Sequence, residues 1–278
     1  MRRACIMGHP VAHSRSPMLH AYWLRTLGID GSYEHADVPP EEFEDFFRGL
    51  KRNGFAGGNI TIPHKEAAFR LVDRRERAAD AIGAVNTVWY EGDTLIGGNT
   101  DWYGMVASLD DIHPGWDAVP GRAVVLGAGG SARASVFAFL ERQFSIAIVN
   151  RTRERAEKLA AQFGPRVSVH GFDALPQLLA DTDVLINNTS LGMAGKPPLE
   201  IDLAPLKKSA IIYDVVYVPL ETPLLKAGKA AGHRTVDGLS MLLYQAVNGF
   251  SHWFGVKPKV TAEQRNILED DIRAKSGA

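Results

Sequence analysis

A glycine-rich segment follows a short apolar run, and its spacing is that of a turn that binds the phosphates of a dinucleotide. Ala123–Leu126 leads directly into Gly127-Ala128-Gly129-Gly130-Ser131-Ala132. In the pattern G-x-G-x-x-G/A, Gly127 permits the tight turn and Gly129 lets the backbone approach a pyrophosphate, while Ala132 permits close helix–strand packing. The helix start that follows offers N–H groups and a positive dipole end. A glycine-rich loop without function is the alternative, but the strand, turn and helix signals agree. We predict cofactor contacts from Gly127, Ala128, Gly129, Gly130, Ser131 and Ala132.

The end of the next predicted strand indicates which dinucleotide is bound. Domains that bind NAD usually carry Asp or Glu there, which accepts a hydrogen bond from the ribose 2′-hydroxyl and repels a 2′-phosphate. Here Ser145–Val149 is followed by Asn150-Arg151-Thr152, without an acid, and Arg155 lies one helical turn further on. A guanidinium pairs with phosphate or stacks on adenine. We therefore predict NADP, held in part by Asn150, Arg151, Thr152 and Arg155.

A simpler explanation exists for the arginines of this segment. They are also what a solvated helix face carries, with Glu154 and Glu157 as local ion-pair partners. We expect this for Arg153, whereas for Arg151 and Arg155 we favour contact with the cofactor.

Polar residues of the first third gather where predicted elements begin and end. Ser14 and Ser16 flank a helix start, a natural place for a carboxylate or another small anion. Thr61 and Lys65 lie around a strand end at positions that can face one cleft. Taken singly, each is explained as a cap, a turn residue or a solvated charge. Together they indicate a partner domain that supplies substrate groups, and the set comprises Ser14, Ser16, Thr61, Lys65, Asn86 and Asp101.

The elements that must position these residues form two α/β parts. In the first part, Ser16 is expected to cap a helix that runs to about Leu27, because Pro17 suits the first helical turn. Apolar residues at helical spacing predict a second helix after Pro40. Gly92-Asp93 predicts a hairpin turn. The expected strands are 4–7, 33–38, 57–62, 85–90 and 94–97, and a further helix is expected over 64–71.

The second part follows a break at Asp110–Gly121, rich in Asp, Gly and Pro. Short buried strands alternate with helices, which predicts a doubly wound parallel sheet of the Rossmann type. We expect strands over 122–126, 145–149, 184–187 and 210–215 and helices over 131–141 and 152–163. A long last helix, Gly238–Phe254, is expected to pack back on the first part. The predicted domains are 1–103 with 239–278 for substrate and 104–238 for NADP.

Composition limits the class of protein. The 278 residues include 45% hydrophobic and 23% charged residues, with a net charge of −1. Such a balance fits an ordinary globular chain and gives no electrostatic footprint for nucleic acid or an anionic membrane. A single cysteine, Cys5, precludes an internal disulfide and fits a reducing compartment. With no H-E-x-x-H helix and no apolar run of about 20 residues, we expect no metal site and no membrane span, and a cytoplasmic location.

Taken together, these motifs resemble the shikimate/quinate dehydrogenase family, most closely its NADP-dependent shikimate dehydrogenases, which reduce 3-dehydroshikimate to shikimate in aromatic amino-acid synthesis. They follow the family order from residue 8 to about residue 255. The departures are Ile60 in place of the usual valine and a tail after Pro258 without a counterpart. The matching segments are Ser14-Arg15-Ser16-Pro17, Asn59–Lys65, Gly83–Thr87, Asn99-Thr100-Asp101, Gly127–Arg133, Asn150-Arg151-Thr152, Asn188–Met193, Asp214–Pro219, and Asp237-Gly238-Leu239 with Gln245.

The resemblance implies a role for particular residues. Lys65 and Asp101 would be the catalytic acid–base pair, with Lys65 aimed at the carbonyl oxygen that gains charge as hydride arrives at carbon. Substrate contacts would come from Ser14, Ser16, Thr61, Asn86, Asp101, Tyr217 and Gln245. Residues beside the nicotinamide would be Thr189, Val215, Gly238, Met241 and Leu242.

Other functions stay open at this point. A quinate/shikimate dehydrogenase that uses NAD is disfavoured by Asn150-Arg151-Thr152, because that relative tends to carry an acid nearby. A folate-linked or glutamyl-type dehydrogenase is disfavoured by the motifs around Lys65 and Asp101. A non-catalytic NADP-binding regulatory protein would have no need of both residues and the serine pair. The expected partner is a small-molecule substrate, and the expected assembly is a monomer or homodimer.

Overall fold

The computed structural model describes residues 1–276 and divides the chain into two compact units. Unit 1 comprises Met1–Thr100 and Gln245–Leu268, and unit 2 comprises Asp101–Tyr244 and the residues after Leu268. The assignment of substrate to residues 1–103 and 239–278, and of cofactor to 104–238, stays a prediction. No helix within residues 1–276 is long and apolar enough to cross a membrane.

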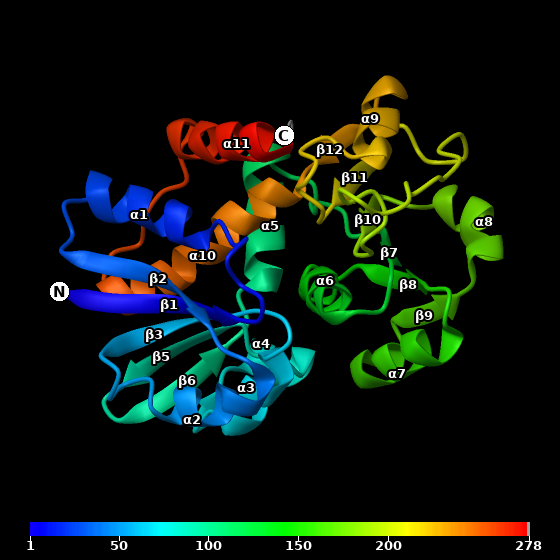
Figure 1. Ribbon diagram of the computed structural model, residues 1–278. Coiled ribbons are helices and arrows are strands. Elements are labelled where there is room, and N and C mark those ends of the chain that lie inside the picture. Colours follow the sequence, from blue (N-terminus) through cyan, green and yellow to red (C-terminus); the bar gives the residue numbers. More distant parts are fainter. Residues whose placement is uncertain (277–278) are drawn as a thin grey trace. The chain divides into compact units, whose positions relative to one another are not determined.

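Unit 1 is built on a six-stranded mixed sheet in the order β2-β1-β3-β5-β6-β4 (Figure 1). β1 pairs in parallel with β2 and β3, whereas β5 pairs antiparallel with β3 and β6. The ends of β1, β3 and β6 and the start of β5 therefore lie at one edge of this sheet. The strands are β1 (Arg2–Gly8), β2 (Gly31–Asp37), β3 (Phe55–Ile60), β4 (Arg74–Arg75), β5 (Thr87–Glu91) and β6 (Thr94–Gly98).

Alternate residues of the unit 1 strands build two cores, one on each face of the sheet. Cys5 and Met7 pack with Phe43 and Phe47 beneath short helices. On the other face, Gly57 lies so close to Trp253 that an added Cβ would be 2.5 Å from its Nε1. The helices of this unit are α1 (Ser16–Thr26), η1 (Pro40–Glu42), α2 (Phe43–Arg48), α3 (Lys65–Leu71) and α4 (Arg77–Ile82).

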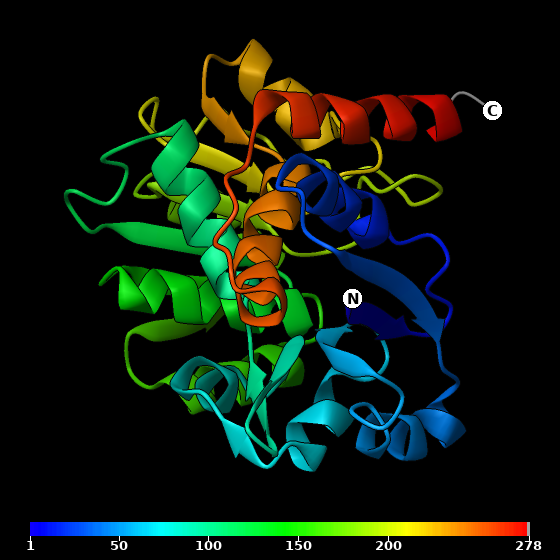
Figure 2. The same cartoon turned by 90° about the vertical axis from the view of Figure 1, so that its left-hand side faces the viewer.

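Helix α10 (Gly238–Phe254) has the bounds predicted from the sequence, and its second half belongs to unit 1. Figures 1 and 2 show α1 and the orange α10 side by side, where the Trp23 and Phe250 rings lie 5.3 Å apart. The Trp253 indole donates to the Val88 carbonyl at 2.8 Å. The prediction that the long C-terminal helix packs on the first part of the chain is thus confirmed for Gln245–Phe254.

Unit 2 has the predicted parallel sheet, in the order β12-β11-β10-β7-β8-β9. This is the Rossmann order, and the strand order reverses between β7 and β10, where such folds bind their ligands. Three of the four strands predicted here have the expected bounds, because each is a short strand that is apolar and buried except at one end. The strands are β7 (Arg122–Leu126), β8 (Ser145–Val149), β9 (Val167–His170), β10 (Val184–Asn187), β11 (Ile211–Asp214) and β12 (Arg234–Val236).

Helices cover both faces of the unit 2 sheet, which makes it doubly wound. Met105 and Phe139 pack with Val125 on one face, and Leu178 and Leu224 pack with strand residues on the other. The helices are α5 (Asp101–Ile112), α6 (Gly130–Glu141), α7 (Arg153–Phe163), η2 (Phe172–Ala174), α8 (Leu175–Leu179) and α9 (Pro223–Ala230), and α11 (Ala262–Ser276) follows α10.

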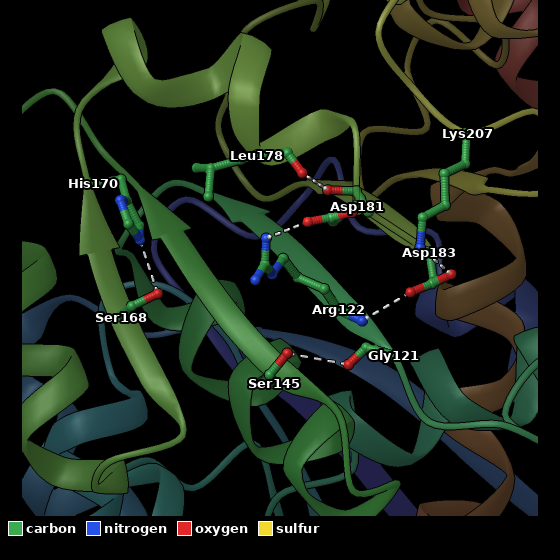
Figure 3. Close-up of polar contacts among 10 residues, drawn as sticks. Gly121, Arg122, Ser145, Ser168, His170, Leu178, Asp181, Asp183 and Lys207 are labelled. Atoms are coloured by element: carbon green, nitrogen blue, oxygen red, sulfur yellow. Dashed lines mark hydrogen bonds and ion pairs between the residues drawn. The ribbon is translucent and has the colours of Figure 1, made fainter.

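The amino ends of the unit 2 strands are joined by a carboxylate (Figure 3). Asp183 accepts from the Arg122 backbone N–H at 2.9 Å and pairs with Lys207 at 3.1 Å. An added Cβ at Gly121 would lie 1.9 Å from the same carboxylate, so any side chain there would displace it. On the same edge, Arg122 Nη1 lies 3.7 Å from Asp181 Oδ2. These contacts fix the start of the central strand β7 at the edge opposite the phosphate turn.

Two local predictions from the sequence are wrong. Ser16 is the first residue of α1 rather than its cap: Arg15 occupies the cap position, and the Ser16 N–H donates to Ser14 Oγ at 3.3 Å. Helix α5 continues to Ile112, into the segment predicted as a break, because Leu109 is fully buried in the core of unit 2. Burial of one apolar helix face outweighs the Asp-rich composition there.

Candidate active site

A cavity of about 480 Å³ lies in unit 2, where β7, β8, β9 and β10 end. The carboxyl ends of parallel strands meet at one edge of a sheet, so segments far apart in sequence converge there. The lining brings together eight of the predicted cofactor residues, which are Gly127, Ala128, Gly129, Asn150, Arg151, Thr152, Arg155 and Thr189. It also contains Phe172, Ser190 and Leu191, which were not predicted.

The phosphate turn has the backbone that its glycines predict. Gly127 has φ +102°, and an added Cβ would lie 3.1 Å from the Thr189 side chain. Around Gly129 and Gly130, by contrast, an added Cβ would meet nothing within 4 Å. Gly129 is the cap residue of α6, and no side chain caps this helix start. A helix start without a side-chain cap, and with open space beside its glycines, is a place where a phosphate group binds.

The arginines after β8 differ in their partners. Arg153 donates to Glu157 at 2.8 Å, as predicted for a solvated helix face. Within residues 1–276, no ion pair involves Arg151 or Arg155, although both line the cavity. Two guanidinium groups at the rim, with no carboxylate lining the cavity, suit a 2′-phosphate better than a bare ribose hydroxyl.

The wall beside the phosphate turn is fixed by Asn187, the last residue of β10. Its Oδ1 accepts from the backbone N–H of Thr189 at 3.0 Å and from the Thr189 hydroxyl at 2.7 Å. The Leu191 N–H in turn donates to Thr189 Oγ1 at 3.1 Å. This segment therefore turns back on itself immediately after the strand and presents Thr189 and Leu191 to the cavity.

The remaining predicted cofactor residues of unit 2 lie outside the cavity lining. Gly130, Ser131 and Ala132 open α6. Val215 follows β11, and an added Cβ at Gly238 would lie 2.1 Å from the Val215 carbonyl oxygen, so only glycine fits there. Met241 packs against the core, and Leu242 lies beside it on α10.

Unit 1 carries a buried polar cluster at the sheet edge where β3 ends and β5 begins. Asn86 Oδ1 accepts from the Thr100 N–H at 2.7 Å, and Asn86 Nδ2 donates to Thr100 Oγ1 at 3.2 Å. The Thr100 hydroxyl also lies 3.2 Å from Gln245 Oε1. Thus two predicted substrate residues, Asn86 and Gln245, are joined through a threonine from a third segment.

A second layer of hydrogen bonds, which was not predicted from the sequence, supports this cluster. The Tyr33 hydroxyl donates to Asn59 Oδ1 at 2.6 Å, and Asn59 Nδ2 donates to Thr87 Oγ1 at 3.0 Å. Burial raises the pKa of Tyr33, which keeps this hydroxyl a donor. An asparagine inside an otherwise apolar strand was the only sequence signal for it.

Ser14, Ser16, Thr61 and Lys65 flank the same edge of the unit 1 sheet. Ser14 lies in the loop after β1, and its carbonyl oxygen is 3.0 Å from His35 Nε2 on β2. Thr61 follows β3 directly, and Lys65 begins α3, where its carbonyl accepts from Val85 N–H at 3.1 Å. In unit 2, Asp101 is the first residue of α5 and Tyr217 lies in the segment after β11.

Comparison with known proteins decides the family. Two protein-family models match the chain. The shikimate dehydrogenase substrate binding domain matches residues 6–88, and shikimate / quinate 5-dehydrogenase matches residues 117–194. A protein of Mesorhizobium japonicum named shikimate dehydrogenase (NADP(+)) is 57% identical over 272 residues, covering 98% of this chain and 97% of that protein. The chain belongs to the shikimate dehydrogenase family.

Solved structures of family members share the whole fold. Shikimate 5-dehydrogenase from Thermus thermophilus, in complex with NADP(H) and shikimate, is 35% identical and matches with a TM-score of 0.85, covering 99% of both chains. Quinate dehydrogenase from Corynebacterium glutamicum, in complex with NAD, is 28% identical with a TM-score of 0.88, covering 97% of this chain and 99% of that one. Proteins of this fold thus include a shikimate dehydrogenase solved with NADP(H) and a quinate dehydrogenase solved with NAD, so the fold alone does not determine the substrate or the cofactor.

Proposed function

We propose that the protein catalyses the reversible reduction of 3-dehydroshikimate to shikimate, with NADPH as the hydride donor. The observation that carries this proposal is the 57% identity, over nearly the full chain, to a shikimate dehydrogenase (NADP(+)). Arg151 and Arg155, which line the cavity, support NADP as the cofactor independently of any relative.

NADPH, when bound, supplies the hydride that is transferred to the substrate carbonyl carbon. The start of α6 would hold the pyrophosphate through the amides of Gly129 to Ser131, because no side chain caps this helix. Arg151 and Arg155 would pair with the 2′-phosphate, because neither is engaged by an acid within residues 1–276. Thr189, Val215, Gly238, Met241 and Leu242 are proposed to lie beside the nicotinamide.

Lys65 and Asp101 are proposed as the acid–base pair. A ketone oxygen gains negative charge as hydride reaches carbon, and an ammonium group aimed at that oxygen stabilises the charge and then donates its proton. The carboxylate of Asp101 would orient the Lys65 ammonium and accept from a substrate hydroxyl. In the reverse direction, Lys65 would take the proton back from the hydroxyl.

The substrate ring is proposed to bind at the polar edge of unit 1. The hydroxyl groups of Ser14 and Ser16 would hold the ring carboxylate, and Thr61, Asn86, Tyr217 and Gln245 would read the ring hydroxyls. Asn86 and Gln245 are almost fully buried and already fixed by Thr100. A preorganised, buried amide discriminates strongly against a ligand that lacks the matching hydroxyl.

An NAD-dependent quinate dehydrogenase is the second candidate, because a relative with that name and cofactor shares the fold. A non-catalytic NADP-binding protein is the third. One experiment separates all three: the turnover of shikimate and of quinate, each with NADP and with NAD. We expect turnover to be highest with shikimate and NADP. Preference for quinate and NAD would overturn the proposal, and NADP binding without turnover of either substrate would favour a regulatory protein.

The cytoplasmic location and the monomeric or homodimeric state also stay predictions.

A further inference from the structure

A buried carboxylate that the proposed reaction does not use lies behind the cofactor cavity. Asp214 is the last residue of β11, and its side chain is fully buried. Three groups donate to it: Asn187 Nδ2 at 2.9 Å, the Val216 N–H at 3.0 Å and the Thr222 hydroxyl at 2.6 Å. Burial of a carboxylate is costly unless such donors surround it. The proposed reaction gives this costly buried group no role, so the carboxylate invites a functional explanation.

The contact with Asn187 links Asp214 to the cavity wall. Asn187 Nδ2 has two hydrogens, and it donates to Asp214 Oδ1 and to the Leu191 carbonyl at 3.1 Å. Both partners are acceptors, so the amide can have only one orientation. Its Oδ1 therefore faces Thr189, from which it accepts both the backbone N–H and the hydroxyl.

This orientation determines what Thr189 can offer a ligand. Its hydroxyl hydrogen is donated to Asn187, and one lone pair of its oxygen accepts from the Leu191 N–H. What remains toward the cavity is an acceptor. A phosphate has no hydrogen to give it, whereas a ribose hydroxyl or a carboxamide N–H of a dinucleotide does.

We propose that Asp214 is a positioning residue for the cofactor: through Asn187 it holds Thr189 as a fixed hydrogen-bond acceptor in the wall of the cavity. This inference rests on the proposed binding of NADP in that cavity. Removal of Asp214 would let the Asn187 amide rotate and the segment Thr189–Leu191 relax. The contact with the cofactor would weaken, while the residues proposed for proton transfer would be untouched.

The test compares Asp214→Leu with two control variants of the full chain, using NADPH itself as the probe. Asp214→Leu is expected to raise the Kd of NADPH up to about tenfold, the upper end of what one lost hydrogen bond between neutral groups gives. The kcat at saturating NADPH should change less than about threefold. Asp214→Asn keeps an oxygen facing Asn187 and Val216, so it should restore a Kd near that of the unmodified protein.

Thr222→Val is the matched control for stability. It removes a different hydrogen bond from the same carboxylate, so it should lower Tm as Asp214→Leu does, while the Kd of NADPH stays unchanged. Equal rises in Kd for Thr222→Val and Asp214→Leu, or no rise for Asp214→Leu, would overturn the positioning role. If Asp214→Leu does not fold, Asp214→Ser against Asp214→Asn gives the answer, because the shorter serine side chain does not reach Asn187 as the Asn oxygen does. Only the serine variant should bind NADPH more weakly, and equal binding by both would refute the proposal.

NADPH binding by the unmodified protein distinguishes a failure of the proposed cofactor from a failure of the proposed role of Asp214. If it does not bind NADPH at all, the proposed cofactor is wrong and the role of Asp214 falls with it. If it binds and turns over NADPH but the variants do not separate as described, only the role of Asp214 is refuted.

Discussion

Arg153 and Glu157 form an ion pair one turn apart on α7, with 2.8 Å between Arg153 Nε and Glu157 Oε1. Arg151, two residues earlier, precedes the helix and lines the cavity. Arg153 is thus paired within its own helix, whereas Arg151 lines the cavity.

This difference predicts opposite results for two substitutions. Arg151→Ala should raise the KM for NADPH by roughly 10- to 100-fold, because a charge-assisted contact with phosphate contributes about 1.5–3 kcal/mol. The KM for NADH should change little, since NADH has no 2′-phosphate. Arg153→Ala should leave both values unchanged. Steady-state kinetics with the two cofactors measure this, and an equal effect of Arg151→Ala on both would refute the 2′-phosphate contact.

Gly127 and Gly129 of the phosphate turn differ in what a side chain at each position would disturb. Gly129→Ala meets no atom within 4 Å and has an ordinary φ of −93°, so the free energy of unfolding should fall by no more than about 1 kcal/mol. The new methyl group would nevertheless occupy the approach of the pyrophosphate, and the Kd of NADPH should rise at least about tenfold.

Gly127→Ala should behave differently, because its φ of +102° disfavours any side chain and the new Cβ would crowd Thr189. We expect its main effect to be a loss of stability, measured by urea unfolding. A Gly129→Ala variant that binds NADPH normally would exclude close contact of the cofactor with this turn.

Substitution of Lys65 tests the proposed proton donor. Lys65→Ala should lower kcat by about 10²- to 10⁴-fold, the range expected for a general acid, while the Kd of NADPH stays within about twofold. Lys51→Ala is the control, because Lys51 forms an exposed ion pair with Asp93 at 2.6 Å. The control should keep full activity. A Lys65→Ala variant with normal kcat would remove Lys65 from the mechanism.

The buried carboxylate of Asp214 predicts a particular dependence of stability on pH. Burial raises its pKa from 3.8 to about 6, against the lowering effect of hydrogen bonds from Thr222, Val216 and Asn187. The native state therefore binds the proton more tightly than the unfolded state. The resulting stability is fully present below pH 4 and is lost as the pH rises through 6, a change of about 3 kcal/mol.

Urea unfolding at pH 4, 5, 6 and 7 checks this prediction against Asp214→Asn, which does not titrate. The difference in the free energy of unfolding, unmodified protein minus variant, should decrease steadily over this range. A constant difference would mean that the carboxyl group has an ordinary pKa.

The sequence predicted the cofactor half of the fold better than the substrate half, for a local reason. Apart from one end residue each (Arg122, Ser145 and Asn187), β7, β8 and β10 consist of buried apolar residues, and parallel strands of this kind need no information from distant segments. The turn Gly127–Ala132 likewise carries its whole geometry within six residues. Helix α10 was predicted with correct bounds because one apolar face continues along its full length.

What the sequence missed depends on contacts between distant segments. Phe172 follows a strand, β9, that was not predicted, so nothing in its neighbourhood marked it as part of the cavity. The Tyr33–Asn59–Thr87 layer joins residues that are tens of positions apart. Serine at the start of α1 was assigned the usual capping role, but the loop before it places the Ser14 oxygen on the Ser16 N–H instead.

Unit 1 is formed by two segments that lie far apart in the sequence, and this has a consequence for folding during synthesis. Its core needs Phe250 and Trp253, which are separated from Thr100 by the whole central stretch of unit 2. During synthesis, domains generally fold as units once their residues have left the ribosome. Asp101–Tyr244, a single uninterrupted stretch, is therefore able to fold first. One apolar face of the unit 1 sheet is covered only by α1 until Phe250 and Trp253 have emerged. Nascent unit 1 is thus the part of this protein that most needs protection from aggregation.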